Sequence, residues 1–493
     1  MDFSFLTHAA ESLNELRSGL LLKSIVIASA VGILSTVFGI LIGFLIYKTD
    51  LRYRNFFKIA LLIPLFISPY IWAVAWKDLF FLLVGNTDFI YSDYGVVLVL
   101  TTVFTPLSFL IIGSALLNID SALEESGLMI TEFKNVLIKI TLPLIKPAVY
   151  GSFILVFIFS ISEFSVPAFL GVEVFTTEIF KQFSAFYNHS VAILQSLLLV
   201  VICVLLLLSE RKYLSGAPFL SIGNKGTKSK IYRFGTGNYY GILFLAVWFV
   251  VTSLLPVAVL TVQSFHKGTE FIFKANEMLG STFAVSFGLA ASGAMLIVFI
   301  GFAGAFYSLV KRESALKKAF DWSLLITFAI PSIILGISLI KFYNRPYLNF
   351  IYSSLGIIII GYTGKFSFIS YKIIENSLRQ IPPAFLESAR LQGIKPFSQV
   401  KNIILPLILP SILASFVIGF VFSIEELGMT IMLYPPGSEI LPIKVFTLMA
   451  NAPKELTASM TLIVFSITLF TLLIFYFLIG FLIRRNKFYD DRI

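Results

Sequence analysis

The sequence has little charge and very few metal-binding side chains. Of its 493 residues, 13% are charged, three are histidine and one, Cys203, is cysteine. A single cysteine excludes both an intramolecular disulfide framework and a cysteine-based metal site. The sequence also has no convincing cluster of histidines or carboxylates of the kind that a membrane enzyme requires. It therefore predicts no catalytic site and no resident metal ion.

Apolar residues dominate instead, at 58% of the chain, with a mean hydropathy of +0.92. They collect in runs of about 20 residues, the length that a helix needs to cross the hydrocarbon of a bilayer. Lipid cannot hydrogen-bond the backbone, so each such run must be helical. We predict an all-α membrane protein with about eleven transmembrane helices, at residues 25–47, 59–84, 96–117, 148–164, 191–208, 241–262, 285–310, 323–340, 353–371, 411–429 and 458–483.

The positive charges favour one orientation in the membrane. If the N-terminus lies outside, 26 of the 37 Lys and Arg fall on the cytoplasmic side and 10 outside, with Lys365 inside a span. Cytoplasmic loops are enriched in Lys and Arg, so we expect an external N-terminus and a cytoplasmic C-terminus. The net charge of +10 then reflects topology, and we expect membrane lipid rather than nucleic acid as a partner.

The sequence repeats itself at a shift of 263 residues. LEESGLMITEFKNVLIKITLPLIKP at 123–147 aligns without a gap on LESARLQGIKPFSQVKNIILPLILP at 386–410, and nine of the 25 positions are identical. The same shift carries the first five spans onto the last five. We therefore predict two units of five helices in the same orientation, related by an axis along the membrane normal.

This repeat predicts the organisation of the chain. Because five crossings leave the chain on the opposite side, one additional span must bring it back before the second unit begins. The predicted parts are a first unit at 1–210, a cytoplasmic linker at 211–239, a connecting helix with an external loop at 240–284, and a second unit at 285–493. Each unit contains one polar loop, which we call the first polar loop (118–147) and the second polar loop (372–406).

Each polar loop has the pattern of a short helix, a turn and a second helix. In the first polar loop, Ser121 to Glu124 fits a capping box. In the second, Gly393 suits a turn with a positive φ angle. The position equivalent to Gly393 in the first loop is Ile130, so the first turn must differ. An amphipathic helix lying on the membrane surface does not explain why the loop recurs at a fixed offset.

The second polar loop resembles a motif of a known family. Its residues Glu387, Ala389 and Gly393 stand in the pattern Glu-Ser-Ala-x-x-x-Gly, followed by Leu405-Pro406. This pattern resembles the "EAA" loop of ABC transporter permeases of the binding-protein-dependent (type I) importer class. The resemblance implies that Glu387, Ala389 and Gly393 contact a separate ATPase and are moved by it.

The resemblance covers nearly the whole chain. SEFSVPAFLG at 162–171 and EELGMTIMLYPPGSEILPIKVFTLM at 425–449 are similar to stretches that follow the fourth core helix in fused two-unit permeases of the ferric-iron type. The resemblance implies the type I ABC importer fold, with two parallel five-helix permease units and one connecting helix. For the first polar loop it implies an ATPase contact at Glu124 and Ser126.

The function implied by this resemblance is a transport subunit in the bacterial cytoplasmic (inner) membrane, not an enzyme. The chain lacks a G-x-x-x-x-G-K-S/T loop, which would wrap backbone donors around phosphates. ATP and Mg²⁺ would therefore bind a separate pair of ATPase subunits, and an external or periplasmic binding protein would deliver the solute. Ferric iron is the favoured solute; thiamine, polyamine or phosphonate-type solutes, and a secondary transporter driven by an ion gradient, are the alternatives.

Three charged residues in or near the spans are candidates for the transport path. A charge near the bilayer midplane costs about 2.5–3.5 kcal/mol on insertion scales. Lys365 could line the path, or it could snorkel or form a structural pair. Glu163 and Glu426, which are equivalent in the repeat, could form a ring of acids at the external mouth of a cation path. They could equally be polar ends of helices, and both interpretations stay open.

Overall fold

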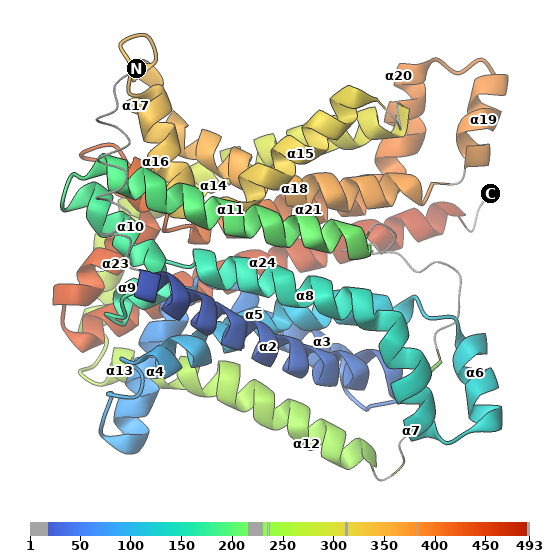
Figure 1. Ribbon diagram of the computed structural model, residues 1–493, viewed down its shortest axis with the longest axis horizontal. Helices are drawn as coiled ribbons and strands as arrows, with labels where there is room; N and C mark the ends of the chain where they lie inside the picture. Colours follow the sequence, from blue (N-terminus) through green and yellow to red (C-terminus); the bar gives the residue numbers. More distant parts are fainter. Residues whose placement is uncertain are drawn as a thin grey trace.

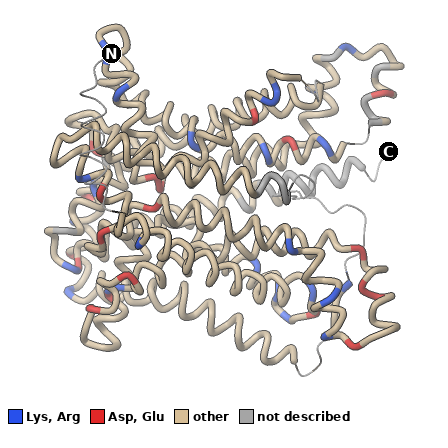
Figure 2. Tube along the Cα trace, viewed as in Figure 1, with Lys and Arg blue, Asp and Glu red and all other residues tan. Residues whose placement is uncertain are grey.

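The computed structural model describes residues 18–490 except 215–229, 234, 236, 311–313 and 382. Over this range the chain is helical, and its β-structure is one isolated bridge between Thr49 and Tyr232. The long helices run side by side through the molecule (Figure 1), and most charged residues lie toward its two ends (Figure 2). This arrangement agrees with the predicted all-α membrane protein.

The first half of the chain contains five spans and several short helices. Its elements are α2 (Ser18–Lys48), α3 (Arg54–Ala60), η1 (Ile63–Phe66), α4 (Pro69–Val84), α5 (Asp93–Leu117), α6 (Ser121–Ile130), α7 (Phe133–Val136), η2 (Leu137–Thr141), α8 (Leu142–Ser162), α9 (Ser165–Phe169), α10 (Phe175–Ser184) and α11 (His189–Leu214). A connecting helix follows, as α12 (Gly237–Phe249), η3 (Val250–Leu254) and α13 (Leu255–Phe265).

The second half has a similar order of elements. They are α14 (Glu270–Val310), α15 (Ala315–Ala329), α16 (Ser332–Tyr343), α17 (Asn349–Tyr352), α18 (Gly356–Arg379), α19 (Pro383–Leu391), α20 (Pro396–Gln399), η4 (Val400–Ile404), α21 (Leu405–Glu425), α22 (Thr430–Leu433), α23 (Leu441–Asn451) and α24 (Lys454–Asp490). The one helix α15 takes the place of α3 and η1, and the short helix α17 is additional. Helix α14 begins well before the predicted residue 285, because its first turns carry the charged residues Glu270, Lys274 and Glu277 and lie beyond the long apolar run.

Helix boundaries recur at the shift found in the sequence. Both ends of α8 and α21 differ by 263 residues, and so do both ends of η2 and η4. The first residues of α4 and α16, and of α5 and α18, obey the same shift. The sequence repeat is therefore also a structural repeat, with corresponding helices in the two halves.

A turn of π-helix precedes each Leu-Pro dipeptide at 142–143, 255–256 and 405–406. Proline has no N–H to donate to the carbonyl four residues earlier, so the regular α-helical ladder cannot continue unchanged. The preceding leucine instead donates five residues back, as from Leu142 to Leu137, which is the π-helical pattern. The polar loops therefore run into α8 and α21 without a break in the helix.

Two of the predicted spans are wrong as continuous helices. The segment predicted at 59–84 is bent by 100° between Phe66 and Pro69, and the one predicted at 323–340 is bent by 112° between Ala329 and Ser332. Proline at 69 and 331 explains these breaks, because the residue before proline is pushed out of helical geometry. The described residues thus hold nine long apolar helices, or eleven spans if each bent pair counts as one.

The two units share one core rather than folding side by side. Helices α10 and α11 of the first half pack against α16 and α15 of the second. The largest buried cluster draws on both halves, and the rings of Trp72 and Phe465 lie 6.5 Å apart within it. The two halves therefore meet in a shared interior. Both polar loops, marked by α6 and by α19 with α20, project from the same end of the molecule (Figure 1).

Candidate functional site

A cavity of about 120 Å³ lies between the two units, beside the breaks in the two bent helices. The first break contributes Leu65 and Pro69 to its wall, and the second contributes Ser332. Non-helical backbone is tolerated at membrane depth where it is buried in protein or lines a cavity. The bends thus bring non-helical backbone and the Ser332 hydroxyl to the wall of the cavity.

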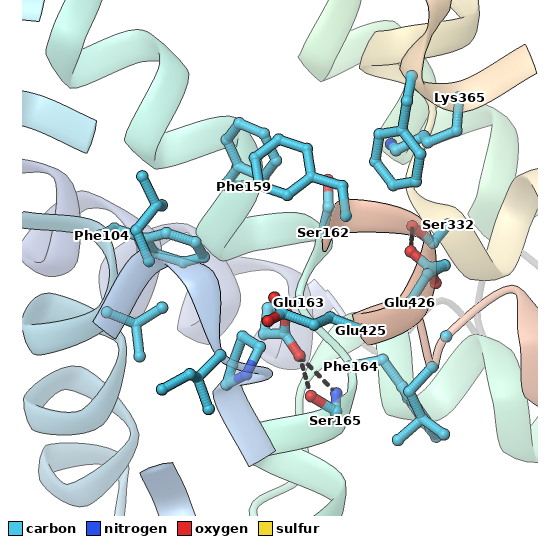
Figure 3. A pocket seen from close by; sticks show the side chains of 18 of the residues that line it. Phe104, Phe159, Ser162, Glu163, Phe164, Ser165, Ser332, Lys365, Glu425 and Glu426 are labelled. Carbon is cyan, nitrogen blue, oxygen red and sulfur yellow. Dashed lines mark hydrogen bonds between the residues drawn. The ribbon is translucent and has the colours of Figure 1, made fainter. Parts of the chain in front are cut away.

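Glu163 enters this cavity at the end of α8. It is the first residue after the helix, and its extended backbone turns the chain toward α9. Its Oε1 atom accepts a hydrogen bond from the Ser165 N–H at 2.7 Å and another from the Ser165 hydroxyl. These two donors hold the carboxylate on the cavity wall (Figure 3).

Glu426 occupies the same place at the end of α21 in the second unit. Its Oε1 accepts from the Met429 N–H at 2.8 Å, and its Oε2 from the Ser332 hydroxyl at 2.9 Å. The neighbouring Glu425 also lines the cavity, and among the described residues its buried Oε1 atom has no hydrogen-bond partner. The repeat pointed to Glu426 but not to Glu425, whose equivalent is Ser162.

Lys365 also lines the cavity, on the same side as Ser332 and Glu426 in Figure 3. Its side chain is only 5% exposed, and its Nζ donates to the carbonyls of Phe328, at 2.9 Å, and Ile330. These carbonyls belong to the end of α15, where the break leaves them without helical donors. Lys365 thus both lines the cavity and caps the broken helix.

The cavity wall combines three carboxylates and one ammonium with aromatic side chains, among them Phe104, Phe159 and Phe422. Charges interact more strongly in such surroundings than in water. The ammonium is bound to backbone carbonyls, whereas Oε1 of Glu425 has no hydrogen-bond partner within the part of the chain that the structure describes. Across the part of the chain that the structure describes, no three His, Cys, Asp or Glu side chains are grouped to hold a metal ion.

The structure places Glu124 of the first polar loop in the interior. Its side chain is fully buried; Oε2 lies 2.7 Å from Lys48 Nζ, and Oε1 accepts from the Thr141 hydroxyl at 2.9 Å. The predicted capping box is wrong, because Asp120 caps α6 by accepting from Ala122 N–H. The Glu124 carboxylate is directed to other elements rather than back to its own helix.

The outer face of the first polar loop carries Ser126, which is exposed and donates to the Leu123 carbonyl at 3.0 Å. Met129 and Ile130 at the end of α6 are 88% and 87% exposed. A run of exposed apolar side chains beyond the spans is typical of a surface that binds another protein. Gly127 lies on the opposite, buried face.

The second polar loop is arranged differently. Glu387 is exposed and Ala389 is buried. Gly393 has a φ angle of +72°, so the prediction of a positive-φ turn is confirmed. In the first loop, Thr131 after α6 has extended backbone instead, as expected from the absence of a glycine there. Leu391 and Phe397 are exposed on either side of the Gly393 turn.

Comparison with known proteins identifies the family. Residues 35–212 and 297–487 match the family described as "Binding-protein-dependent transport system inner membrane component". The chain is 25% identical over 417 residues to the Fe(3+)-transport system permease protein FbpB 2 of Haemophilus influenzae, covering 83% of this chain and 79% of that protein. It is 24% identical over 360 residues to the ferric transport system permease protein FbpB of Actinobacillus pleuropneumoniae, covering 65% of this chain and 51% of that protein.

A different relative matches less of the chain. The putative 2-aminoethylphosphonate transport system permease protein PhnV of Salmonella typhi is 24% identical over 234 residues, which is 45% of this chain and 89% of that protein. The family match includes most of each half and both polar loops. The chain therefore belongs to the family of binding-protein-dependent transport system inner membrane components, the permeases of ABC importers.

Proposed function

We propose that this permease imports ferric iron, delivered by an external binding protein and driven by a separate pair of ATPase subunits that bind ATP and Mg²⁺. Two relatives that are named as ferric-iron transport permeases match 83% and 65% of the chain. The proposed orientation has the polar loops in the cytoplasm, the N-terminus outside and the C-terminus inside, as the distribution of Lys and Arg favours.

The observation that carries the choice of a cation is the acidic cavity between the units. Glu163, Glu425 and Glu426 line it, against one ammonium, that of Lys365. Hard cations take oxygen ligands, so carboxylates in a small, largely apolar cavity favour a metal cation over an anionic phosphonate. The carboxylates would offer a passing cation a temporary replacement for water or for ligands of the binding protein.

Energy would enter through the polar loops. Both project from one end of the molecule (Figure 1), beyond the spans, where separate ATPase subunits could bind both at once. Ser126, Glu387 and the turn at Gly393 are proposed to lie against these subunits, with Ala389 packed behind them. Closure of the ATPase pair would move both loops and rock the two units about the cavity, a rigid-body transition between two states.

The test is uptake into proteoliposomes that contain the permease, its ATPase subunits and binding protein. We expect ferric-iron uptake that requires ATP, and a loss of at least tenfold in the double variant Glu163→Gln with Glu426→Gln. The exposed carboxylate of Glu277 provides the matched control, since Glu277→Gln removes the same charge outside the cavity. Uptake driven by an ion gradient without ATP would contradict the proposed energy source.

The choice of solute is tested in the same vesicles. Thiamine, a polyamine and 2-aminoethylphosphonate replace ferric iron, each with its own binding protein or at high external concentration. ATP-dependent uptake of one of these in preference to iron would replace the proposed solute. Unchanged iron uptake in the double Gln variant would leave Glu163 and Glu426 as polar helix ends without a role in the path.

A further inference from the structure

The first polar loop is tied to the end of α2 by a buried ion pair. Lys48 is the last residue of α2, and its Nζ lies 2.7 Å from Glu124 Oε2 with both side chains 0% exposed. Thr141, at the end of η2, donates to the other oxygen of Glu124. One carboxylate therefore joins α2, α6 and η2, and both of its oxygens are occupied.

The linker between the two units packs beside this ion pair through Tyr232. Tyr232 donates its N–H to the Lys48 carbonyl at 2.7 Å, and its own carbonyl accepts from Asp50 N–H at 3.2 Å. Its ring is 7% exposed and packs against Phe133, the first residue of α7, with ring centroids 4.9 Å apart. Burial and then the charge of Glu124 raise the pKa of the Tyr232 phenol, which stays neutral at physiological pH.

Two outer contacts hold the same linker segment. Lys230 lies 3.0 Å from Glu125, the neighbour of Glu124 on α6. Asn238, at the start of α12, donates to Asp50 at 2.9 Å. The linker thus touches both the end of α2 and the first polar loop. We call Lys48, Glu124 and Tyr232 the latch.

The second polar loop differs at the positions that build the latch. Ile404 stands where Thr141 stands in the first loop, and it has no hydroxyl to donate. Glu387, the equivalent of Glu124, is exposed. The equivalent of Lys48 is Lys311, which lies outside the described residues. The linker itself occurs once in the chain, between the two units.

We propose that the latch makes the first polar loop and the end of α2 move as one body, and that its members are positioning residues rather than contacts of the ATPase. This inference rests on the proposed function. Separating a buried ion pair leaves two uncompensated charges in the interior, so the pair resists relative movement of α6 and α2. Glu124 then serves a different purpose from Glu387.

The route from the latch to the cavity is continuous. Helix α2 packs along α5 and α8. Those two helices carry Phe104 and Phe159 on the cavity wall, and α8 ends at Glu163. A displacement of the first polar loop would therefore reach the acidic cavity through packed helices. Each polar loop also runs directly into a long helix, the first through η2 into α8 and the second through η4 into α21.

The test uses the complex of permease and ATPase subunits in proteoliposomes with the binding protein. The double variant Lys48→Met with Glu124→Gln removes both charges together, which buried ion pairs usually tolerate without unfolding. We expect wild-type amounts of the complex and at least half of the wild-type ATP hydrolysis. We expect solute uptake per ATP hydrolysed to fall at least tenfold.

Two controls use neighbouring groups. Lys230→Met with Glu125→Gln makes the same change of charge in the exposed pair, and uptake per ATP should stay within twofold of wild type. Tyr232→Ala removes the ring and should lower uptake per ATP at least threefold. Tyr232→Phe keeps the ring and should stay within twofold.

The ratio of uptake to hydrolysis separates the possible outcomes. A merely structural role for the ion pair would lower the amount of complex, hydrolysis and uptake together, leaving uptake per ATP unchanged, and this result would overturn the latch. If uptake per ATP hydrolysed is unchanged in Tyr232→Ala, Tyr232 is not part of the latch. The absence of ATP-driven uptake in the wild type would instead overturn the proposed function. This outcome is distinguishable from failure of the latch, because it is seen in the wild-type protein without any variant.

Discussion

The two polar loops have related sequences but are held in different ways. In the first, Glu124 is buried between Lys48 and Thr141. In the second, the equivalent Glu387 is exposed, and the loop turns on Gly393 with its open, positive-φ backbone. The difference teaches that a residue repeated within one chain can keep its place in a motif while its partners give it another role.

The second unit also has a buried charged network, but in another place. Glu375, near the end of α18, is 5% exposed and lies 2.7 Å from Arg379 and 3.0 Å from Lys372. Across from it, Lys317 and Asp321 pair on α15. The members of this network lie on α15 and in the last turns of α18, where the second polar loop begins. In the first unit the buried pair involves Glu124, on the short helix α6.

The largest expected effect is that of removing one partner of the buried pair. Glu124→Ala leaves the Lys48 ammonium buried without a carboxylate, which costs about 3–5 kcal/mol of unfolding free energy. Glu387→Ala removes an exposed side chain and should change stability by no more than about 0.5 kcal/mol. Thermal unfolding of the two variants in detergent measures the difference. Equal losses of stability in the two variants would show that the buried contacts of Glu124 do not distinguish it from Glu387.

A smaller effect is expected from Thr141→Val, which keeps the shape of the side chain but removes the donor to Glu124. A buried acceptor without its hydrogen bond costs about 1–3 kcal/mol. The same substitution should cost less than half as much when Lys48→Met and Glu124→Gln are already present, because the carboxylate is then gone. A double-mutant cycle measures this coupling. Additive effects would show that Thr141 acts independently of Glu124.

Substitution of a glycine should lower stability in both loops, but for different physical reasons. A Cβ at Gly127 would lie 2.5 Å from Ile140 and 3.1 Å from Val136, so Gly127→Leu overpacks the first loop at a cost of about 1–3 kcal/mol. Gly393 has open space around it but a φ angle of +72°, so Gly393→Ala costs about 1–2 kcal/mol in backbone strain.

Asparagine separates these two causes. It tolerates left-handed backbone better than other non-glycine residues, so Gly393→Asn should recover much of the stability that Gly393→Ala loses. The same residue at Gly127 should recover nothing, because the restriction there is space. Unfolding midpoints of the four variants measure both effects. A benefit from asparagine at Gly127 would contradict the packing explanation.

Much of the fold could be predicted because its signals are local. Apolar runs gave the spans, and the fixed shift of 263 residues gave the correspondence that both ends of α8 and α21 obey. The turn at Gly393 followed from one residue type, since glycine alone adopts a positive φ without steric cost. These features need no information about which distant residues meet.

The bends and the latch could not be predicted for the opposite reason. A run of apolar residues looks the same whether its helix is straight or broken, although Pro69 and Pro331 were a signal that could have been used. Lys48 and Glu124 are 76 residues apart, and one sequence contains no record of such pairings. Glu425 could not be found from the repeat, because its equivalent is Ser162 and the repeat highlights only what the two halves share.

The smallest expected effect concerns the exposed pair that joins the linker to the first polar loop. Lys230 and Glu125 lie 3.0 Å apart with side chains 31% and 49% exposed. Such pairs contribute about 0–1 kcal/mol and weaken as salt is added. Glu125→Gln should therefore lower stability by less than about 1 kcal/mol at low salt and by nothing measurable at 1 M salt.

The contrast with the buried pair lies in this salt dependence. Salt screens charges in water but reaches a fully buried pair far less, so the loss of stability in Glu124→Ala should persist at 1 M salt. Unfolding of both variants along a salt series measures this directly. If the two losses faded together with added salt, the Lys48–Glu124 pair would be reached by solvent, and the first polar loop would be no more firmly held than the second.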